Sequence, residues 1–181
     1  MSKAIQQLID KRARKCEIGL AMPEASAAIA ALHVRSARDA YADLVSDELL
    51  EREYDAGAKT ALWERVLPNR QNPDTPGFAL AAWLDGGLAG FLDCAVSTDT
   101  TPAVAEITAL YVDPGAWRIG VGSVLIEQLD QGLRAIGVTT CCAWVLECNE
   151  PAVRAYESWR FAATGETQMS SLGAEVQMRL A

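Results

Sequence analysis

Histidine is almost absent from this 181-residue sequence, since only His33 is present, and no Cys-x-x-Cys pair occurs. Zinc sites are built from several cysteine and histidine ligands at short spacings, so we do not expect a bound metal. Residues 1–15 are basic but include no continuous apolar stretch, so we do not expect a secretory signal there. The five cysteines are odd in number, which favours reduced thiols and a cytoplasmic protein.

Long apolar runs and an excess of basic residues are also missing. No run approaches the roughly 20 apolar residues of a transmembrane helix, so we expect no membrane association. The 24 acidic residues outnumber the 16 lysines and arginines, and the net charge is −8. Non-specific nucleic-acid binding needs a basic surface, so nucleic acid is not an expected partner. The acidic charge is compatible with a positively charged substrate.

Half of the residues are apolar, which is enough to fill the core of one domain. We assign this domain to residues 16–181 and treat residues 1–15 as an N-terminal extension. Apolar spacing and turn residues predict strands at 16–20, 78–84, 88–96, 103–112, 139–146, 161–169 and 175–180. Helices are predicted to begin at Pro23 and at Asn149. Two further helices are predicted at 46–67, with a break near Gly57, and at 120–136. A loop is predicted at 68–77. This order predicts an α/β fold, in which a mixed sheet of about six or seven strands carries helices on both faces.

A glycine-bearing loop between a strand and a helix is the most informative stretch of the chain. Residues 105–111 have the pattern of a buried strand, residues 124–129 that of a helix, and Gly120 and Gly122 lie between them. Unpaired N–H groups at a helix N-terminus attract anions, and glycines let a ligand approach the backbone closely. The loop is therefore either a phosphate or pyrophosphate site or an ordinary turn whose glycines serve packing. A dinucleotide-binding motif fits less well, because its third glycine would fall at Leu125.

A second motif follows the glycine loop and its helix. It reads Asn149-x-x-Ala152-x-x-x-Tyr156-Glu157-x-x-x-Phe161. With A-E-I-T-A-L-Y-V-D-P-G-A-W-R-I-G-V-G-S-V-L-I at 105–126, it resembles the two signature motifs of the GCN5-related N-acetyltransferase (GNAT) family. The resemblance covers about residues 16–180. In addition, the stretch from His33 to Tyr41 is similar to a subgroup of bacterial members.

The resemblance implies a GNAT fold that binds acetyl-CoA as co-substrate and passes its acetyl group to a primary amine. In the family this is a direct attack within a ternary complex, without a covalent enzyme intermediate. The matching positions imply cofactor contacts from Leu110, Tyr111, Val112, Trp117, Arg118, Ile119, Gly120, Val121, Gly122, Ser123, Asn149 and Ala152. Three residues depart from the family's pattern, since Trp117 replaces Gln or Arg, and Arg118 and Arg160 replace glycine.

Glu106 and Tyr156 match catalytic positions of the family. An alkyl amine has a pKa of about 10 and arrives protonated, so Glu106 is expected to remove its proton, directly or through a water. The phenol of Tyr156 is expected to protonate the departing thiolate, while a backbone N–H near Val112 polarises the thioester carbonyl. The alternatives are a carboxylate at the rim of the sheet for Glu106 and a core tyrosine for Tyr156.

The acceptor is expected to be a small-molecule amine bound against the first two helices. His33 and Tyr41 are candidates for this acceptor wall, although a lone histidine on an apolar stripe is more often a packing residue. Two other functions stay open, a non-catalytic acyl-CoA-binding sensor and an acetyltransferase of protein N-termini or lysines. Members of the family commonly pair through sheet edges or C-terminal strands, so a homodimer is expected.

Overall fold

The computed structural model describes residues 16–72, 75–99 and 101–180. The extension predicted for residues 1–15 therefore lies outside the described residues. The first half contains β1 (Cys16–Leu20), η1 (Pro23–Ala25), α2 (Ser26–Tyr41), α3 (Asp47–Glu53), α4 (Ala56–Arg70), β2 (Gly77–Leu84) and β3 (Gly87–Ser97). The second half contains β4 (Val104–Val112), η2 (Pro114–Ala116), α5 (Val121–Ala135), β5 (Thr140–Leu146), α6 (Glu150–Ser158), β6 (Phe161–Ser170) and β7 (Gly173–Leu180).

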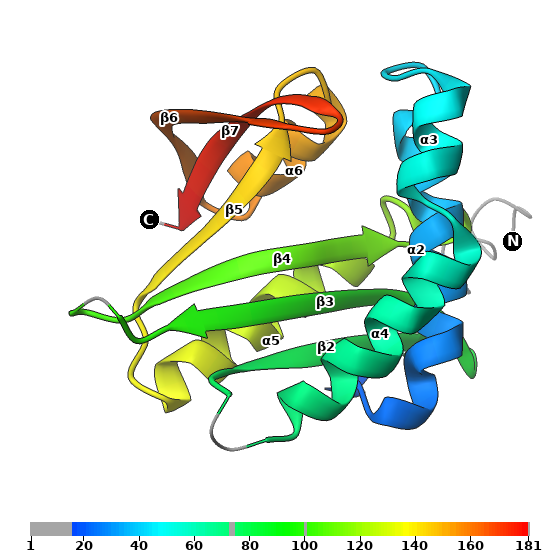
Figure 1. The fold of residues 1–181 in the computed structure, drawn as a ribbon. Coiled ribbons are helices and arrows are strands. Elements are labelled where there is room, and N and C mark those ends of the chain that lie inside the picture. Colours follow the sequence, from blue (N-terminus) through cyan, green and yellow to red (C-terminus); the bar gives the residue numbers. More distant parts are fainter. Residues whose placement is uncertain (1–15, 73–74, 100, 181) are drawn as a thin grey trace, which may run out of the picture.

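The strands form one seven-stranded sheet in the order β1-β2-β3-β4-β5-β7-β6 (Figure 1). Neighbouring strands are antiparallel except β4 and β5, which run parallel. The mixed α/β sheet predicted from the sequence is therefore confirmed. The nearly continuous apolar run of β5 lies inside this sheet, between β4 and β7, where both of its faces are covered or partly covered.

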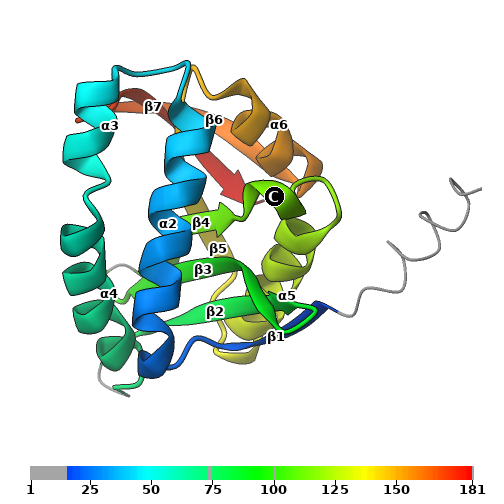
Figure 2. The same cartoon turned by 90° about the vertical axis from the view of Figure 1, so that its right-hand side faces the viewer.

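Helices cover both faces of the sheet, as predicted (Figure 2). α2 and α4 pack against β2, β3 and β4 on one face, and α5 packs against β1 to β4 on the other. α6 shares the core of α5 through Tyr156 and Trp159. Every helix within the described ranges is too short or too polar to cross a membrane.

A bulge in β4 separates this strand from β5. Asp93 and Cys94 are consecutive in β3, but their partners in β4 are two positions apart, which leaves Thr108 as an extra residue in β4. The parallel pairing with β5 ends at Ile107. Because a bulge bends its strand, β4 and β5 diverge beyond this point, and Figure 1 shows the resulting gap in the ladder.

Two helix boundaries differ from the sequence-based expectation. The break before α4 lies at Asp55 rather than at Gly57, because the Asp55 side chain accepts a first-turn N–H at 2.7 Å and caps the helix. α4 then continues through Pro68, where the sequence predicts a loop. Its last residue, Arg70, pairs with Asp93 of β3 at 2.8 Å, and this contact holds the final turn in place.

Candidate active site

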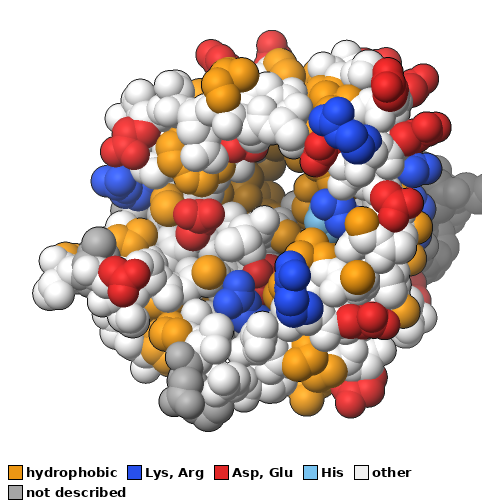
Figure 3. Space-filling model, in the orientation of Figure 1, with side chains coloured by type: hydrophobic (Ala, Val, Ile, Leu, Met, Phe, Trp, Pro, Cys, Tyr) orange, Lys and Arg blue, Asp and Glu red, His pale blue; other side chains and the backbone are white. Residues whose placement is uncertain are grey.

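A cleft of about 890 Å³ lies where β4 and β5 diverge. Its walls come from α2, the end of β4, the loop before α5, the end of β5, α6 and β7. Figure 3 shows the front of the molecule hollowed between the β6–β7 hairpin and the helices α2 and α3. The two motifs singled out in the sequence, at 105–126 and 149–161, therefore meet in one cavity.

The end of β4 offers unpaired backbone groups to the cleft. The Asp113 N–H donates to the Ala89 carbonyl on the β3 side at 2.8 Å. Because the backbone groups of successive residues in a strand point to opposite edges, the N–H and C=O groups of Leu110 and Val112 point away from β3. β5 no longer pairs with β4 at this level. The Val112 carbonyl accepts the Trp117 indole N–H at 2.7 Å. The other groups of Leu110 and Val112 face the gap, where an extended ligand can pair with them.

The two glycines of the loop have different roles. Gly120 has φ of 99° and precedes the first residue of α5, and an added Cβ would meet no atom within 4 Å. This position needs the left-handed conformation and is open to a ligand. At Gly122, a Cβ would lie 2.8 Å from the Trp159 ring, whose N–H donates to Ser123 Oγ at 2.9 Å. Gly120 therefore leaves room for a ligand, whereas Gly122 is explained by its packing against Trp159.

The arginines that replace family glycines keep a glycine-like backbone. Arg118 has φ of 60° and Arg160 has φ of 68°, both in the left-handed region. A side chain in this region costs about 1 kcal/mol, which the surrounding fold offsets. The loop at Arg118 and the turn at Arg160 therefore retain the conformation that a glycine would adopt, and Arg118 adds a positive charge to the cleft wall.

Asn149 and Tyr156 reach the cleft from the second motif. Asn149 Oδ1 accepts the Ala152 N–H at 3.2 Å and caps α6, so its capping role is present. Tyr156 is buried edge-on against Trp159 and Phe161 and also lines the cleft. Burial raises the pKa of Tyr156 above its usual value, so the phenol keeps its proton at neutral pH.

Most of the predicted cofactor residues line this cleft. Those in contact with it are Leu110, Tyr111, Val112, Trp117, Arg118, Gly120, Val121, Gly122, Ser123, Asn149 and Ala152. Ile119 does not line it and packs instead against the core beside α5. Ile119 thus anchors the loop while the residues on either side of it line the cavity, a distinction that the motif alone does not reveal.

Glu106 lies outside the cleft wall. It is exposed on the paired part of β4, next to Cys142 of β5. Partial desolvation raises its pKa, and the nearby negative charge of Glu175 raises it further. The carboxylates that do line the cleft are Asp39 of α2 and Glu175 of β7. Sequence reasoning missed both, because Asp39 is not one of the positions that carry the similarity of the stretch from His33 to Tyr41 and Glu175 lies in no recognisable motif.

Of the two predicted acceptor residues, Tyr41 lines the cleft and His33 does not. His33 is buried among the rings of Tyr54, Trp63, Phe91 and Tyr111. Its Nδ1 accepts the Trp63 indole N–H at 3.1 Å. Burial, with a smaller contribution from Lys59, lowers the pKa of His33 to about 3. The structure places His33 as a neutral packing residue behind the cleft.

Acidification is expected to destabilise the protein through His33. The folded state favours the neutral imidazole, whereas the unfolded chain binds a proton near pH 6.5. Stability is therefore lost as the pH falls below about 6.5, by about 2 kcal/mol at pH 5 relative to pH 7. Urea unfolding of the wild type and His33→Gln at both pH values measures this loss, which the variant should lack. Equal pH dependence of the two proteins would contradict it.

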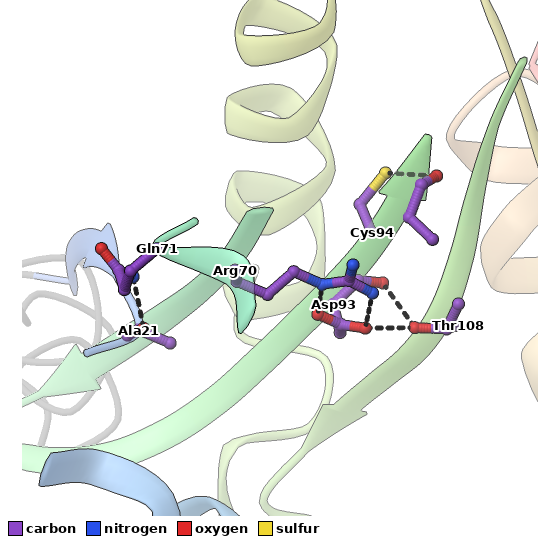
Figure 4. A network of polar contacts seen from close by, with 7 residues as sticks. Ala21, Arg70, Gln71, Asp93, Cys94 and Thr108 are labelled. Carbon is purple, nitrogen blue, oxygen red and sulfur yellow. Dashed lines mark hydrogen bonds and ion pairs between the residues drawn. The ribbon is translucent and has the colours of Figure 1, made fainter. Parts of the chain in front are cut away.

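Two ion pairs hold the walls of the cleft in position. Arg35 of α2 donates to the Asp113 carboxylate at 3.0 Å, and Asp113 also accepts the Gly115 N–H at 2.9 Å. This pair ties the helix on one wall to the loop of the other. On the far side of β4, Asp93 lies between Arg70 and Thr108 (Figure 4).

The pair of Arg70 and Asp93 supports the bulge. Both Arg70 donors lie 2.8 Å from the two Asp93 carboxylate oxygens. The Thr108 hydroxyl donates to the same carboxylate and to the Asp93 backbone carbonyl. The side chains of Arg70 and Asp93 are 12% and 4% exposed, so water competes little for these bonds. Thr108 lines the cleft, and the network therefore sets the shape of the cleft at the bulge.

Comparison with known proteins agrees with this architecture. The model of the acetyltransferase (GNAT) family matches residues 39–161. Mycothiol acetyltransferase of Nocardiopsis dassonvillei is 37% identical over 107 residues, which are 56% of this chain and 32% of that protein. The chain therefore spans about a third of the length of this relative. An uncharacterised N-acetyltransferase of Schizosaccharomyces pombe is 28% identical over 160 residues, covering 88% of this chain and 97% of the relative.

Among solved structures, the PaiA N-acetyltransferase of Thermoplasma acidophilum in complex with coenzyme A has the same fold. The TM-score is 0.77 at 21% identity, over 92% of this chain and 98% of the other. The family model covers both sequence motifs. The chain that carries them has the sheet order, the β4 bulge and the glycine loop described above. The chain belongs to the GNAT family of acetyltransferases.

Proposed function

We propose that this protein transfers the acetyl group of acetyl-CoA to a small-molecule primary amine in a ternary complex. The observation that carries the proposal is the cleft between β4 and β5. It combines the backbone groups of Leu110 and the N–H of Val112, which face the gap, with the open helix N-terminus at Gly120. When bound, acetyl-CoA supplies an acetyl group activated as a thioester.

The cleft residues fit such a co-substrate. The backbone of Leu110 and Val112 can pair with the amide groups of the pantetheine arm, and the α5 N-terminus can bind the pyrophosphate. Arg118 and Arg154 add positive charge to the wall near this helix. Ile119 contributes from outside the cleft by holding the loop against the core.

We assign the proton transfers to Glu106 and Tyr156. The raised pKa of Glu106 makes its carboxylate a better base, and its place outside the cleft wall favours action through a water. Tyr156 keeps its proton at neutral pH and lines the cleft, which suits an acid that protonates the departing thiolate. A thiol leaving group has a pKa near 8.5, which is below the pKa of a phenol. The cleft must therefore desolvate the thiolate, which raises its pKa, so that the phenol can protonate it.

The turn between β6 and β7 favours a small acceptor over a protein. Leu172 lines the cleft and packs against the cluster of Ala37, Leu50 and Tyr54 in the helical wall. Ser171 lies close enough to the Glu53 carboxylate to contribute, after Arg52, to lowering the pKa of that group. The turn thus approaches the helices across the acceptor side, where a protein substrate needs an open groove. A homodimer, a cytoplasmic location and the absence of a metal stay predictions.

Binding of acetyl-CoA is the first test of this function. Titration calorimetry is expected to give binding to the wild type, weakened about tenfold or more in Gly120→Glu. The added carboxylate repels the phosphates at the helix N-terminus and strains a left-handed backbone position.

Gly137→Glu is the matched control, since Gly137 also has a positive φ and open space but lies beyond the other end of α5. It should bind like the wild type. Equal losses in the two variants, or no binding by the wild type, would overturn the proposed cofactor site. Binding without thiol release in the presence of any amine would identify a sensor domain instead.

A further inference from the structure

The charged residues of the cleft are segregated by sign. Arg118 precedes α5, Arg154 lies on α6, and both helices cover one face of the sheet. Asp39 lies on α2, on the opposite face. Glu175 lies on that face too, because its β7 neighbour Val176 packs into the α5 core and successive strand residues alternate. The cleft therefore crosses the sheet with arginines on one side and carboxylates on the other.

An unpartnered hydroxyl lines the cleft on α2, the helix that carries Asp39. Ser36 of α2 is 1% exposed and lines the cleft, and among the described residues its Oγ has no hydrogen-bond partner. A hydroxyl can both donate and accept, and buried polar groups in proteins are almost always paired. Glu175 is only partly engaged, since one of its oxygens accepts the Gln168 amide at 2.7 Å. The acidic side thus retains polar groups that can bind a ligand.

The reaction itself limits what these carboxylates can bind. The amine that attacks the thioester must be neutral, so it cannot remain the counter-ion of Asp39 and Glu175 at that moment. A second cationic group on the same molecule can stay paired with them throughout the transfer. Tyr41, Tyr111 and Trp144 line the same cleft and provide aromatic surface for the carbon chain and the cation.

We infer that the acceptor is a small amine that carries a second positively charged group, which the carboxylates of Asp39 and Glu175 bind. This inference rests on the proposed acetyl transfer. Acetylation of one amine removes one charge from the acceptor, and the proton released passes to the base. The product then keeps the charged group that anchors it on the α2 side.

Kinetics with matched amines test this inference. Straight-chain diamines of three to five carbons are compared with monoamines of equal length at saturating acetyl-CoA, with thiol release as the readout. The best diamine is expected to exceed its monoamine in kcat/KM by at least about tenfold, which corresponds to one ionic contact of about 1.4 kcal/mol. Asp39→Asn and Glu175→Gln should each reduce this preference several-fold and leave the calorimetric Kd for acetyl-CoA unchanged. Asp43→Asn, four residues further along and outside the cleft wall, is the control that should keep the preference.

The outcomes separate this inference from the proposed function. Equal rates with diamines and monoamines, or a preference that survives both carboxylate variants, would overturn the inference alone. Transfer to monoamines but to no diamine would do the same. Faster transfer to peptide N-termini than to any small amine would overturn the inference together with the small-molecule acceptor of the proposed function. Absence of acetyl-CoA binding would overturn the proposed function and this inference with it.

Discussion

Asp93→Asn is expected to lower the free energy of unfolding by about 3–5 kcal/mol, because it leaves the buried Arg70 guanidinium without its counter-charge. It also alters the acceptor of the Thr108 hydroxyl at the β4 bulge. For a domain of this size, each kcal/mol corresponds to a shift of about 2–4 °C in Tm. Calorimetric melting and urea unfolding at pH 7 measure the loss directly.

Asp130→Asn is the matched control for this experiment. Asp130 makes an i,i+4 pair with Arg134 at 3.1 Å, but the two side chains are 24% and 67% exposed. Exposed pairs contribute about 0.5 kcal/mol or less, so this variant should melt close to the wild type. If the two variants lost the same stability, the network behind the bulge would not be the support that we describe.

Tyr156→Phe is expected to lower kcat by about 100-fold or more, because the thiolate loses its proton donor. Phenylalanine keeps the ring that packs against Trp159 and Phe161, so the fold and the Kd for acetyl-CoA should not change. Thiol release at saturating substrates gives kcat, and calorimetry gives Kd. A kcat close to that of the wild type would show that Tyr156 acts only in the core.

The pH profile gives an independent check on the same residue. Since burial raises the pKa of Tyr156 above about 10, its phenol stays protonated through the alkaline range of an ordinary assay. The wild-type rate should therefore rise with pH as Glu106 loses its proton and should not fall again below about pH 10.

Tyr41→Phe is the matched control for Tyr156→Phe, and we expect it to change the KM of the amine rather than kcat.

The cofactor side of the cleft could be predicted from the sequence because it depends on local backbone conformation. The glycine loop and the cap at Asn149 each act through neighbours within a few residues. The replacements at Arg118 and Arg160 did not disturb them, since both arginines adopt positive φ. A strand, a loop and a helix start in sequence therefore indicated where the open helix N-terminus of the cleft lies.

Apart from Tyr41, the α2 and β7 side of the cleft could not be predicted in the same way, because its residues meet only through the tertiary fold. Arg35 and Asp113 are 78 positions apart, and nothing in either local sequence indicates the other. Asp39 comes from α2, near the start of the described chain, and Glu175 from β7, the last strand in it. Glu106 matched a family position, but β4 and β5 are still paired at this residue. The cleft opens only where the pairing ends near Ile107, so Glu106 lies outside its wall. The helix start at Asp55 was instead placed near Gly57, although it could have been recognised, because aspartate is a preferred N-cap residue.

The contact between Trp159 and Gly122 restricts the order in which this sequence can evolve. Any residue larger than glycine at 122 collides with the indole ring, which is itself fixed by its bond to Ser123. Trp159 must therefore become smaller before Gly122 can change, whereas the reverse order passes through a damaged intermediate. Descendants of this chain that carry a larger residue at 122 should already have lost the tryptophan at 159.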